Sequence, residues 1–254
     1  RPNVTMSEID PATMAATRSE EVPFDDSLLP KQWHYNNDGS VDFPNAKAGA
    51  DINLFSAWEL TTGRPDVIVA VVDEGVCYAH KDLQANMLVN EAELNGSEGV
   101  DDDNNGYVDD IYGYNFVDNG RVTWTRNGDS GHGTHVAGTV AAVNNNGIGV
   151  CGVAGGDRKK KINGAKLMSC QIFEGKNSAS GAEAIKWGAD HGAVISQNSW
   201  GYTNLDSTPN FFKPWKIALD DPPVPNIKAF LCWDSNNGSI DCMKPMMSEL
   251  YPIS

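Results

Sequence analysis

The sequence predicts an α/β fold, a parallel β-sheet with helices on both faces. Three observations support it: a continuous apolar run at 67–72, the alternation of strand-like and helix-like segments after it, and a sufficient length. The chain has 254 residues, 40% of them hydrophobic, enough for one sizeable core. Right-handed crossovers between successive parallel strands place the intervening helices on both faces. No apolar run approaches the ~18 residues that a membrane-spanning helix needs, so no membrane span is expected.

The run at 67–72 is mostly β-branched, too short for a helix and apolar at every position, which is typical of a central parallel strand. It ends on Asp73. In such sheets, chemistry gathers at the carboxyl ends of the strands, where Asp73 is predicted to lie. The other expected elements are a helix at 51–62, capped by Asp51 and ended by Gly63, a small-residue helix at 134–143, a strand at 165–173, a helix at 182–191 and a strand from 193.

The two ends of the chain differ in composition from its middle. Residues 1–23 show no sustained period and are interpreted as a linker or the remnant of a pro-segment. Residues 24–254 are assigned to one domain, truncated at its carboxyl end, in which the tail at 214–254 is atypical: it is rich in proline, and no element is placed there. Because the chain opens at Arg1 and not at a methionine, the lack of a signal peptide says little about targeting.

The net charge of −15 argues against a nucleic-acid partner, because phosphates would be repelled. Much of the acidity is concentrated at 101–103 and 109–110, which indicates a cation site. The basic run at 158–161 is interpreted as a solvated loop between two elements.

Asp73 and His132 are the candidate catalytic residues. His132 stands between Gly131 and Gly133, just ahead of a predicted helix, and glycines let the backbone approach a partner closely. An aspartate that orients a histidine and stabilises its imidazolium is the base half of a nucleophilic triad. Taken singly, a strand-end aspartate is more often a turn residue and a lone histidine is more often structural. The hypothesis therefore depends on the surrounding segments.

Those segments together resemble the subtilisin-like serine proteases, or subtilases. They are VVDEGV at 71–76 with HKDL at 80–83, GHGTHVAGT at 131–139, NNGIGVCGVA at 145–154 and ISQNSWG at 195–201. They follow the family's order, aspartate before histidine, over about residues 28 to 205. The resemblance implies a subtilisin-like fold, Asp73 as the triad aspartate and His132 as the general base. It also implies a serine endopeptidase that cleaves extended polypeptides by acyl transfer.

The resemblance also implies how a polypeptide substrate binds. Ser199, Trp200 and Gly201 match the strand that lines the family's substrate cleft, and their main-chain groups would pair with an extended peptide. The chain's own pro-segment is a further candidate partner. Secretion, or a place at the cell surface, is the expected location.

The sequence departs from the family in three places. Glu74 follows the aspartate where the family usually has threonine or serine. The oxyanion motif Ala-Gly-Asn is absent, and 236–238 is only a distant candidate. The nucleophile motif, Gly-Thr-Ser followed by Met-Ala, is absent too. Ser130 echoes the serine motif of trypsin-like enzymes, but it precedes His132 by two residues and is interpreted as part of a turn.

The missing serine leaves three explanations open. The chain is a fragment whose remainder is encoded further on, or it has lost its reading frame near residue 215, or it is a pseudoprotease that binds peptides. Retention of both Asp73 and His132 weighs against the last, since a binding module needs neither. The preferred prediction is a serine endopeptidase of which this chain holds only the aspartate and the histidine.

Residues 101–110 predict a Ca²⁺ site. Carboxylate or amide oxygens recur at alternate positions, with Gly106 where a calcium loop bends. Tyr112 stands where an EF-hand-type loop has its glutamate. An unmetallated acidic loop is the alternative, but carboxylates this close repel one another without a cation. Asp82 is a candidate for a second site. The predicted ligands of the loop are Asp101, Asp103, Asn105, the Tyr107 carbonyl, Asp109 and Asp110.

Overall fold

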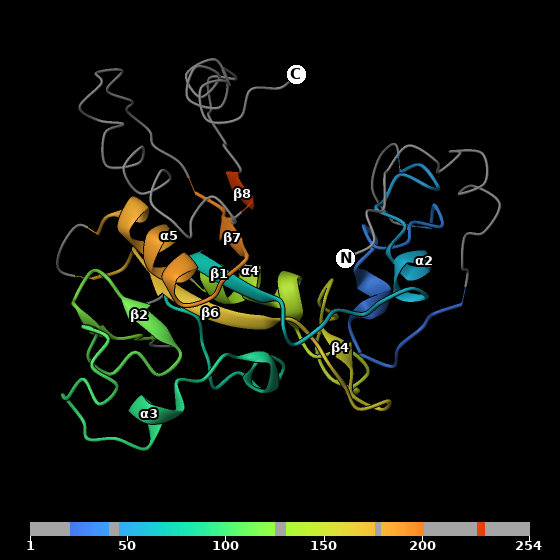
Figure 1. Cartoon of the computed structure of the whole chain (residues 1–254). Helices are drawn as coiled ribbons and strands as arrows, with labels where there is room; N and C mark the ends of the chain where they lie inside the picture. Colours follow the sequence, from blue (N-terminus) through green and yellow to red (C-terminus); the bar gives the residue numbers. More distant parts are fainter. Residues whose placement is uncertain (1–20, 41–45, 125–130, 176–178, 201–227, 232–254) are drawn as a thin grey trace, which may run out of the picture.

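The computed structural model describes residues 21–40, 46–124, 131–175, 179–200 and 228–231. Its main feature is a six-stranded sheet with the strand order β3-β2-β6-β1-β7-β8 (Figure 1). Neighbouring strands are parallel except for β2 and β3, which are antiparallel. The predicted α/β class is confirmed, with one antiparallel edge strand added to the parallel sheet.

The elements have the following bounds. The strands of the large sheet are β1 Ile68–Asp73, β2 Gly113–Asn115, β3 Gly120–Arg121, β6 Lys166–Gln171, β7 Ile195–Asn198 and β8 Lys228–Leu231, and a separate hairpin is formed by β4 Gly156–Asp157 and β5 Ile162–Asn163. The helices are α2 Leu54–Trp58, α3 Glu91–Leu94, α4 His132–Ala141 and α5 Gly181–Asp190, with 3-10 turns η2 Leu29–Lys31 and η3 Gln84–Asn86.

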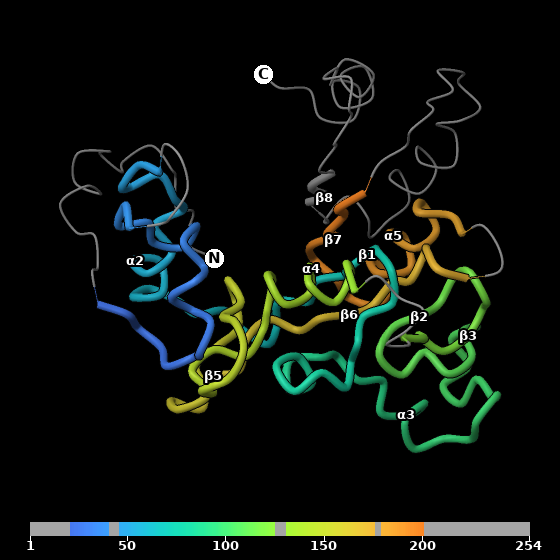
Figure 2. The backbone as a smooth tube through the Cα atoms, turned by 180° about the vertical axis from the view of Figure 1, so that it is seen from behind, coloured from blue at the N-terminus to red at the C-terminus, as the bar shows by residue number. Residues whose placement is uncertain are grey.

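The side chains of β1 alternate between two cores, one on each face of the sheet. Ala70 and Val72 belong to the cluster that includes α5, whereas Val69 and Val71 belong to the cluster that includes α4. Figure 2 shows α4 on the near side of the sheet and α5 behind it. The continuous apolar run thus covers a strand buried on both faces, as predicted.

The amino-terminal part of the described chain packs around a third hydrophobic cluster, rich in aromatic residues, which includes Tyr35 and Trp58. Both side chains donate hydrogen bonds to the segment that follows α4. The Tyr35 hydroxyl donates to the Cys151 carbonyl and the Trp58 indole donates to the Val153 carbonyl, each at 2.9 Å. The described residues at 21–40 and 46–60 are therefore joined to the following part of the chain by buried rings and by hydrogen bonds.

Two predicted helix boundaries were wrong. The helix expected at 51–62 is reduced to α2, because the Asp51 carboxylate accepts from Asn53 N–H and from Asn37 N–H and so stabilises a turn. Asn53, with φ of 51°, is the residue that enters the helix. The helix expected at 134–143 begins two residues earlier, so His132 is its first residue and does not merely precede it.

The later elements are confirmed with small shifts. Residues 165–173 contain β6, residues 182–191 contain most of α5, and the strand expected from 193 is β7. Ser180 caps α5 by accepting from Glu183 N–H. One element, β8, lies in the tail where no element was expected, and it adds to the sheet beside β7. Four residues are too few to show a period in the sequence.

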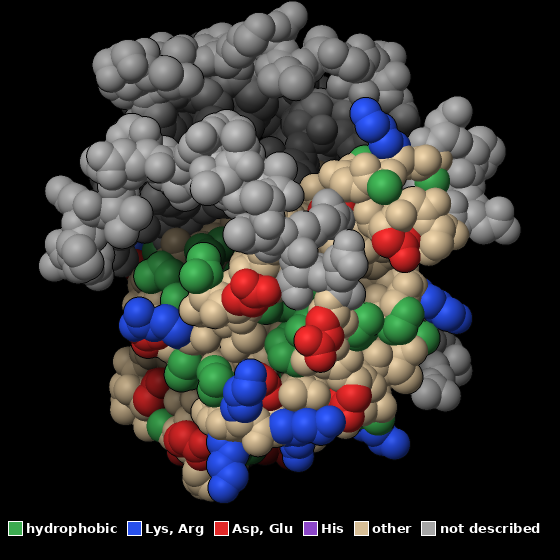
Figure 3. Space-filling model, turned by 90° about the vertical axis from the view of Figure 1, so that its right-hand side faces the viewer, with side chains coloured by type: hydrophobic (Ala, Val, Ile, Leu, Met, Phe, Trp, Pro, Cys, Tyr) green, Lys and Arg blue, Asp and Glu red, His purple; other side chains and the backbone are tan. Residues whose placement is uncertain are grey.

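The basic run at 158–161 connects β4 to β5 and is exposed, as predicted. Lys159 and Lys160 form ion pairs with Asp25 and Asp157. The face shown in Figure 3 carries acidic and basic side chains intermixed. Within the described ranges, none of the helices has the length and apolar character required to cross a membrane.

Candidate active site

Asp73 and His132 come together at the carboxyl end of the central strand. Asp73 is the last residue of β1 and is 1% exposed, and His132 opens α4. The distance from His132 Nδ1 to Asp73 Oδ1 is 2.8 Å. Because an ionised carboxylate only accepts hydrogen bonds, the proton is assigned to Nδ1. This tautomer leaves Nε2 as the ring atom able to accept a proton.

The glycine that follows the histidine allows this close approach. A Cβ atom on Gly133 would lie 2.7 Å from the Glu74 carbonyl oxygen and 3.2 Å from Asp73 Oδ1. Gly75 is equally constrained, since a Cβ atom there would lie 2.0 Å from the Thr123 carbonyl oxygen. The glycines of the two motifs therefore reflect the space between the end of β1 and the start of α4.

Glu74 contacts the same histidine from the other side. Its Oε2 accepts a hydrogen bond of 3.1 Å from the backbone N–H of His132. The N-cap residue, Gly131, has φ of 80° and offers no side chain to the helix. Glu74 departs from the family's usual threonine or serine, and its contact with His132 depends on residues 58 positions apart, which no local pattern shows.

The pKa values of the pair are both shifted. The hydrogen bond to Asp73 raises the pKa of His132 above its ordinary value, against a smaller effect of burial. Burial raises the pKa of Asp73, and the hydrogen bonds from His132 and Glu74 N–H oppose that rise. The net rise of the Asp73 pKa thus comes from burial, whereas that of the His132 pKa comes first from the hydrogen bond to Asp73. The contribution of His132 to stability is full below its unfolded-state pKa, where Asp73 is still ionised, and is lost as the pH rises through its folded-state pKa.

The predicted substrate strand continues from β7. Asn198 pairs with Val72 in the last step of the ladder with β1, and Ser199 and Trp200 follow beyond it. The Trp200 indole donates to the Val72 carbonyl at 2.8 Å, which anchors this segment beside Asp73. Gly201 lies outside the described residues, as do Ser130 and the segment 236–238.

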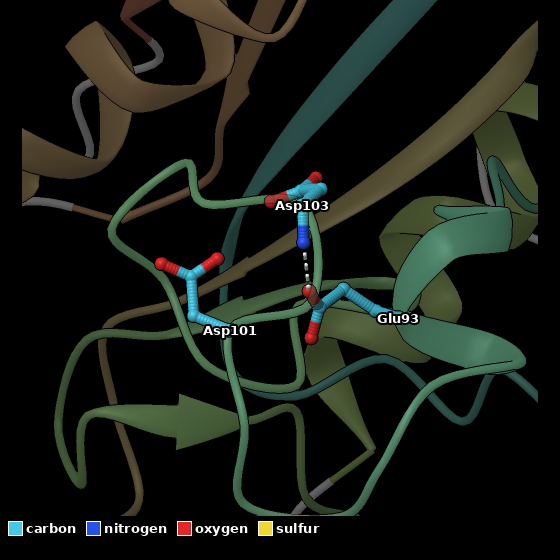
Figure 4. Close-up of side chains that lie close together, drawn as sticks. All are labelled: Glu93, Asp101 and Asp103. Carbon is cyan, nitrogen blue, oxygen red and sulfur yellow. Dashed lines mark hydrogen bonds between the residues drawn. The ribbon is translucent and has the colours of Figure 1, made fainter.

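The acidic loop has its own geometry, some of it unforeseen. Carboxylate oxygens of Glu93, Asp101 and Asp103 all lie within 4.8 Å of one another. Figure 4 shows that Glu93 reaches the loop from α3, beside the backbone nitrogen of Asp103. Its carboxylate is buried and also accepts from the N–H groups of Asp102 and Asp109. Glu93 was not predicted, because it precedes the loop pattern by eight residues.

The remaining predicted ligands are held by other contacts. The Asn105 side-chain amide donates to Asp103 and Asp110, and the Asn105 oxygen accepts from Tyr107 N–H. Asp109 accepts from the N–H of Gly99 and lies 3.8 Å from Arg121. Asp110 is buried, and its burial raises the pKa of its carboxyl. The structure thus gathers Asp101 and Asp103 around Glu93.

Asp82, the candidate for a second site, is 2% exposed and accepts from Asn146 Nδ2 and Val150 N–H. A second buried carboxylate, Asp26, accepts from the N–H groups of Asn145 and Asn146. The two acids share one loop, and each already receives hydrogen bonds from it. A cation at Asp82 stays a prediction.

Comparison with known proteins relates the chain to one family. The model of the subtilase family matches residues 64–229. Subtilisin-like protease 1 of Plasmodium berghei is 41% identical over 138 residues, 53% of this chain and 21% of that protein. The halolysin-like extracellular serine protease Nep of Natrialba magadii is 33% identical over 156 residues, 61% of this chain and 24% of that protein.

A solved structure supports the same fold. The serine protease of Aeromonas sobria has 24% sequence identity and a TM-score of 0.57, over 84% of this chain and 32% of that one. The chain spans about a fifth to a quarter of the length of the two curated relatives. The match of the family model ends at residue 229. It therefore includes the first part of the tail at 214–254, which the sequence pattern left without an element.

Proposed function

Since the chain belongs to the subtilase family, we propose that it is the aspartate–histidine part of a serine endopeptidase that cleaves extended polypeptides. One observation carries the proposal: the 2.8 Å contact between His132 Nδ1 and the buried Asp73 carboxylate. A histidine oriented in this way is a general base that is ready to act on a hydroxyl nucleophile.

Each residue would have a defined role in acyl transfer. His132 Nε2 takes the proton of the attacking serine and later gives it to the leaving amine. Asp73 holds the ring in the tautomer that carries its proton on Nδ1, and it stabilises the imidazolium formed in the reaction. The raised pKa of His132 agrees with this role, because its cause is the carboxylate hydrogen bond.

The substrate would lie along the segment that follows β7. Beyond Asn198 the main chain has no ladder partner on β1, and the Trp200 indole fixes its course. This segment runs next to the Asp73–His132 pair, so its main chain is placed where an extended peptide could add as a further strand. Ser199, Trp200 and Gly201 are the residues proposed for this contact.

The proposal is tested by sequencing the DNA that encodes residues 200–254 and the following several hundred bases. We expect Ala-Gly-Asn and then Gly-Thr-Ser in one of the three forward frames, because the base half alone has no use in proteolysis. If neither motif occurs in any frame, the endopeptidase proposal fails for this gene. Micromolar binding of an extended peptide, measured by calorimetry, would then assign the chain as a pseudoprotease.

A Ca²⁺ site at the acidic loop is part of the proposal. Glu93, Asp101 and Asp103 offer hard oxygen ligands close together, the kind that Ca²⁺ prefers. Asn105, Tyr107, Asp109 and Asp110 would supply further oxygens, as the loop pattern predicts. A bound cation would remove the repulsion within the loop and so stabilise the fold.

Secretion and binding of the chain's own pro-segment are proposed on the family resemblance, and one relative is named an extracellular protease.

The Ca²⁺ proposal predicts a change in thermal stability. At a free Ca²⁺ concentration 100-fold above the Kd, the melting temperature should rise by about 5–10 °C over that in EDTA. The variant with Asp101→Asn and Asp103→Asn should lose this rise. Glu98→Gln, an exposed acid beside the loop, serves as the matched control and should keep it. Equal melting temperatures of the wild type with Ca²⁺ and with EDTA would refute the site.

A further inference from the structure

Two consecutive residues hold His132 at different atoms. Asp73 Oδ1 contacts the imidazole at Nδ1, and Glu74 Oε2 accepts from the backbone N–H of the same residue at 3.1 Å. We propose that Glu74 is a positioning residue that fixes the backbone of His132 while Asp73 fixes its ring. The inference rests on the proposed function, since it concerns how the general base is held.

The start of α4 explains why a side chain from elsewhere is needed. The first N–H groups of a helix have no partner within the helix, and a capping side chain normally accepts from one of them. Gly131 has no side chain and adopts a left-handed conformation. Glu74, 58 residues earlier in the chain, fills this role from the loop after β1.

The contact joins two elements that must keep a fixed distance. Asp73 ends the central strand and Glu74 follows it in the next loop, whereas His132 belongs to the start of α4. The two hydrogen bonds act on different parts of the residue, one on the ring and one on the backbone. Together they fix both the ring and the backbone, so that the direction of Nε2 is set by the sheet.

The negative charge of Glu74 has a second consequence. A carboxylate at a helix amino terminus interacts favourably with the helix dipole. Among the described residues, the charged groups that raise the pKa of His132 are Asp73 on β1 and Glu74 in the following loop. Glu74 also raises the pKa of Asp73, as the smallest of several contributions. Loss of its charge should therefore lower the pKa of His132.

Two substitutions separate the hydrogen bond from the charge. Glu74→Gln keeps an acceptor oxygen and the side-chain length but removes the charge, whereas Glu74→Ala removes both. The 254-residue chain is labelled with ¹³C and ¹⁵N on histidine, and NMR follows the ring titration and the amide exchange of His132. Glu98→Gln, an exposed acid remote from this contact, is the control for a general change in charge.

The two substitutions should give different results. Glu74→Gln should shift the ring titration of His132 to lower pH and leave amide exchange nearly unchanged. Glu74→Ala should shift the titration too and should quicken amide exchange on the order of fivefold, the usual effect of losing a cap. A titration and an exchange rate that stay at wild-type values in Glu74→Gln and Glu74→Ala would overturn the proposal.

Asp73→Asn distinguishes this inference from the proposed function. If it lowers the titration midpoint of His132 while the Glu74 variants do not, only the role of Glu74 is refuted. If Asp73→Asn also leaves the midpoint unchanged, the Asp73–His132 pair itself is absent in solution and the proposed function loses its support. Because Glu74→Gln keeps the acceptor, its result tests the charge alone. If Glu74→Ala folds poorly, Glu74→Leu, which has a similar size but no acceptor, tests the hydrogen bond and should quicken amide exchange in the same way.

Discussion

The purified 254-residue chain will not be labelled by a serine-directed fluorophosphonate probe. Such probes react with a serine that a general base activates, and the chain holds no Gly-Thr-Ser segment after His132. In subtilisin, loss of the nucleophilic serine alone lowers kcat about a millionfold, and that measured value sets the expected scale. Intact-mass spectrometry after prolonged exposure to the probe is the measurement.

Two controls give this result its meaning. A complete, active subtilisin-like protease treated in parallel should be labelled stoichiometrically. A His132→Ala variant of the chain should behave as the unmodified chain does, since neither holds an activated serine. Stoichiometric labelling of the chain, abolished in His132→Ala, would reveal an unexpected nucleophile, which peptide mapping would then locate.

Trp187→Ala should cost about 3–5 kcal/mol of the free energy of unfolding. Trp187 lies on α5, is 3% exposed and belongs to the cluster that packs on β1. Its ring stacks on His191 with centroids 4.1 Å apart, and it lies 5.9 Å from both Phe116 and Tyr107. Truncation would leave a large cavity beneath the acidic loop, which Tyr107 joins to this cluster. Urea unfolding followed by far-ultraviolet circular dichroism is the measurement.

Trp187→Phe is the matched control. The indole Nε1 of Trp187 is buried without a hydrogen-bond partner in the part of the chain that the structure describes. Phenylalanine keeps an aromatic ring in the cluster and removes this unpaired donor, so the loss should be well below that of alanine. Equal losses for the two variants would contradict the cavity explanation.

The Asp73–His132 pair shows which features of the site a local sequence pattern can predict. The apolar run before Asp73 predicts a buried strand, and the glycines around His132 predict a close approach. Both signals are local, because strand burial depends on consecutive residues and glycine acts on its own backbone. The contact between residues 59 positions apart (132 − 73) followed from the resemblance to the family, and the structure provides its geometry.

The acidic loop shows where local patterns fail. Its oxygens at alternate positions were visible at 101–110, but Glu93, which holds three N–H groups of the loop, lies outside any such spacing. The helix expected at 51–62 failed for a related reason. The Asp51 carboxylate accepts a hydrogen bond from the N–H of Asn37, a residue 14 positions away. This contact stabilises a turn where a long helix was expected.

The sequence by itself determined the α/β class, the central strand that ends on Asp73, and the family to which the motifs point. These properties depend on consecutive residues, because patterns of apolar residues and the positions of glycines indicate them directly. Only the tertiary structure decided which carboxylates lie together: Asp73 with Glu74 at His132, and Glu93 with Asp101 and Asp103. The reason is physical, because a hydrogen bond or an ion site depends on distances of a few ångströms that arise when separate elements pack.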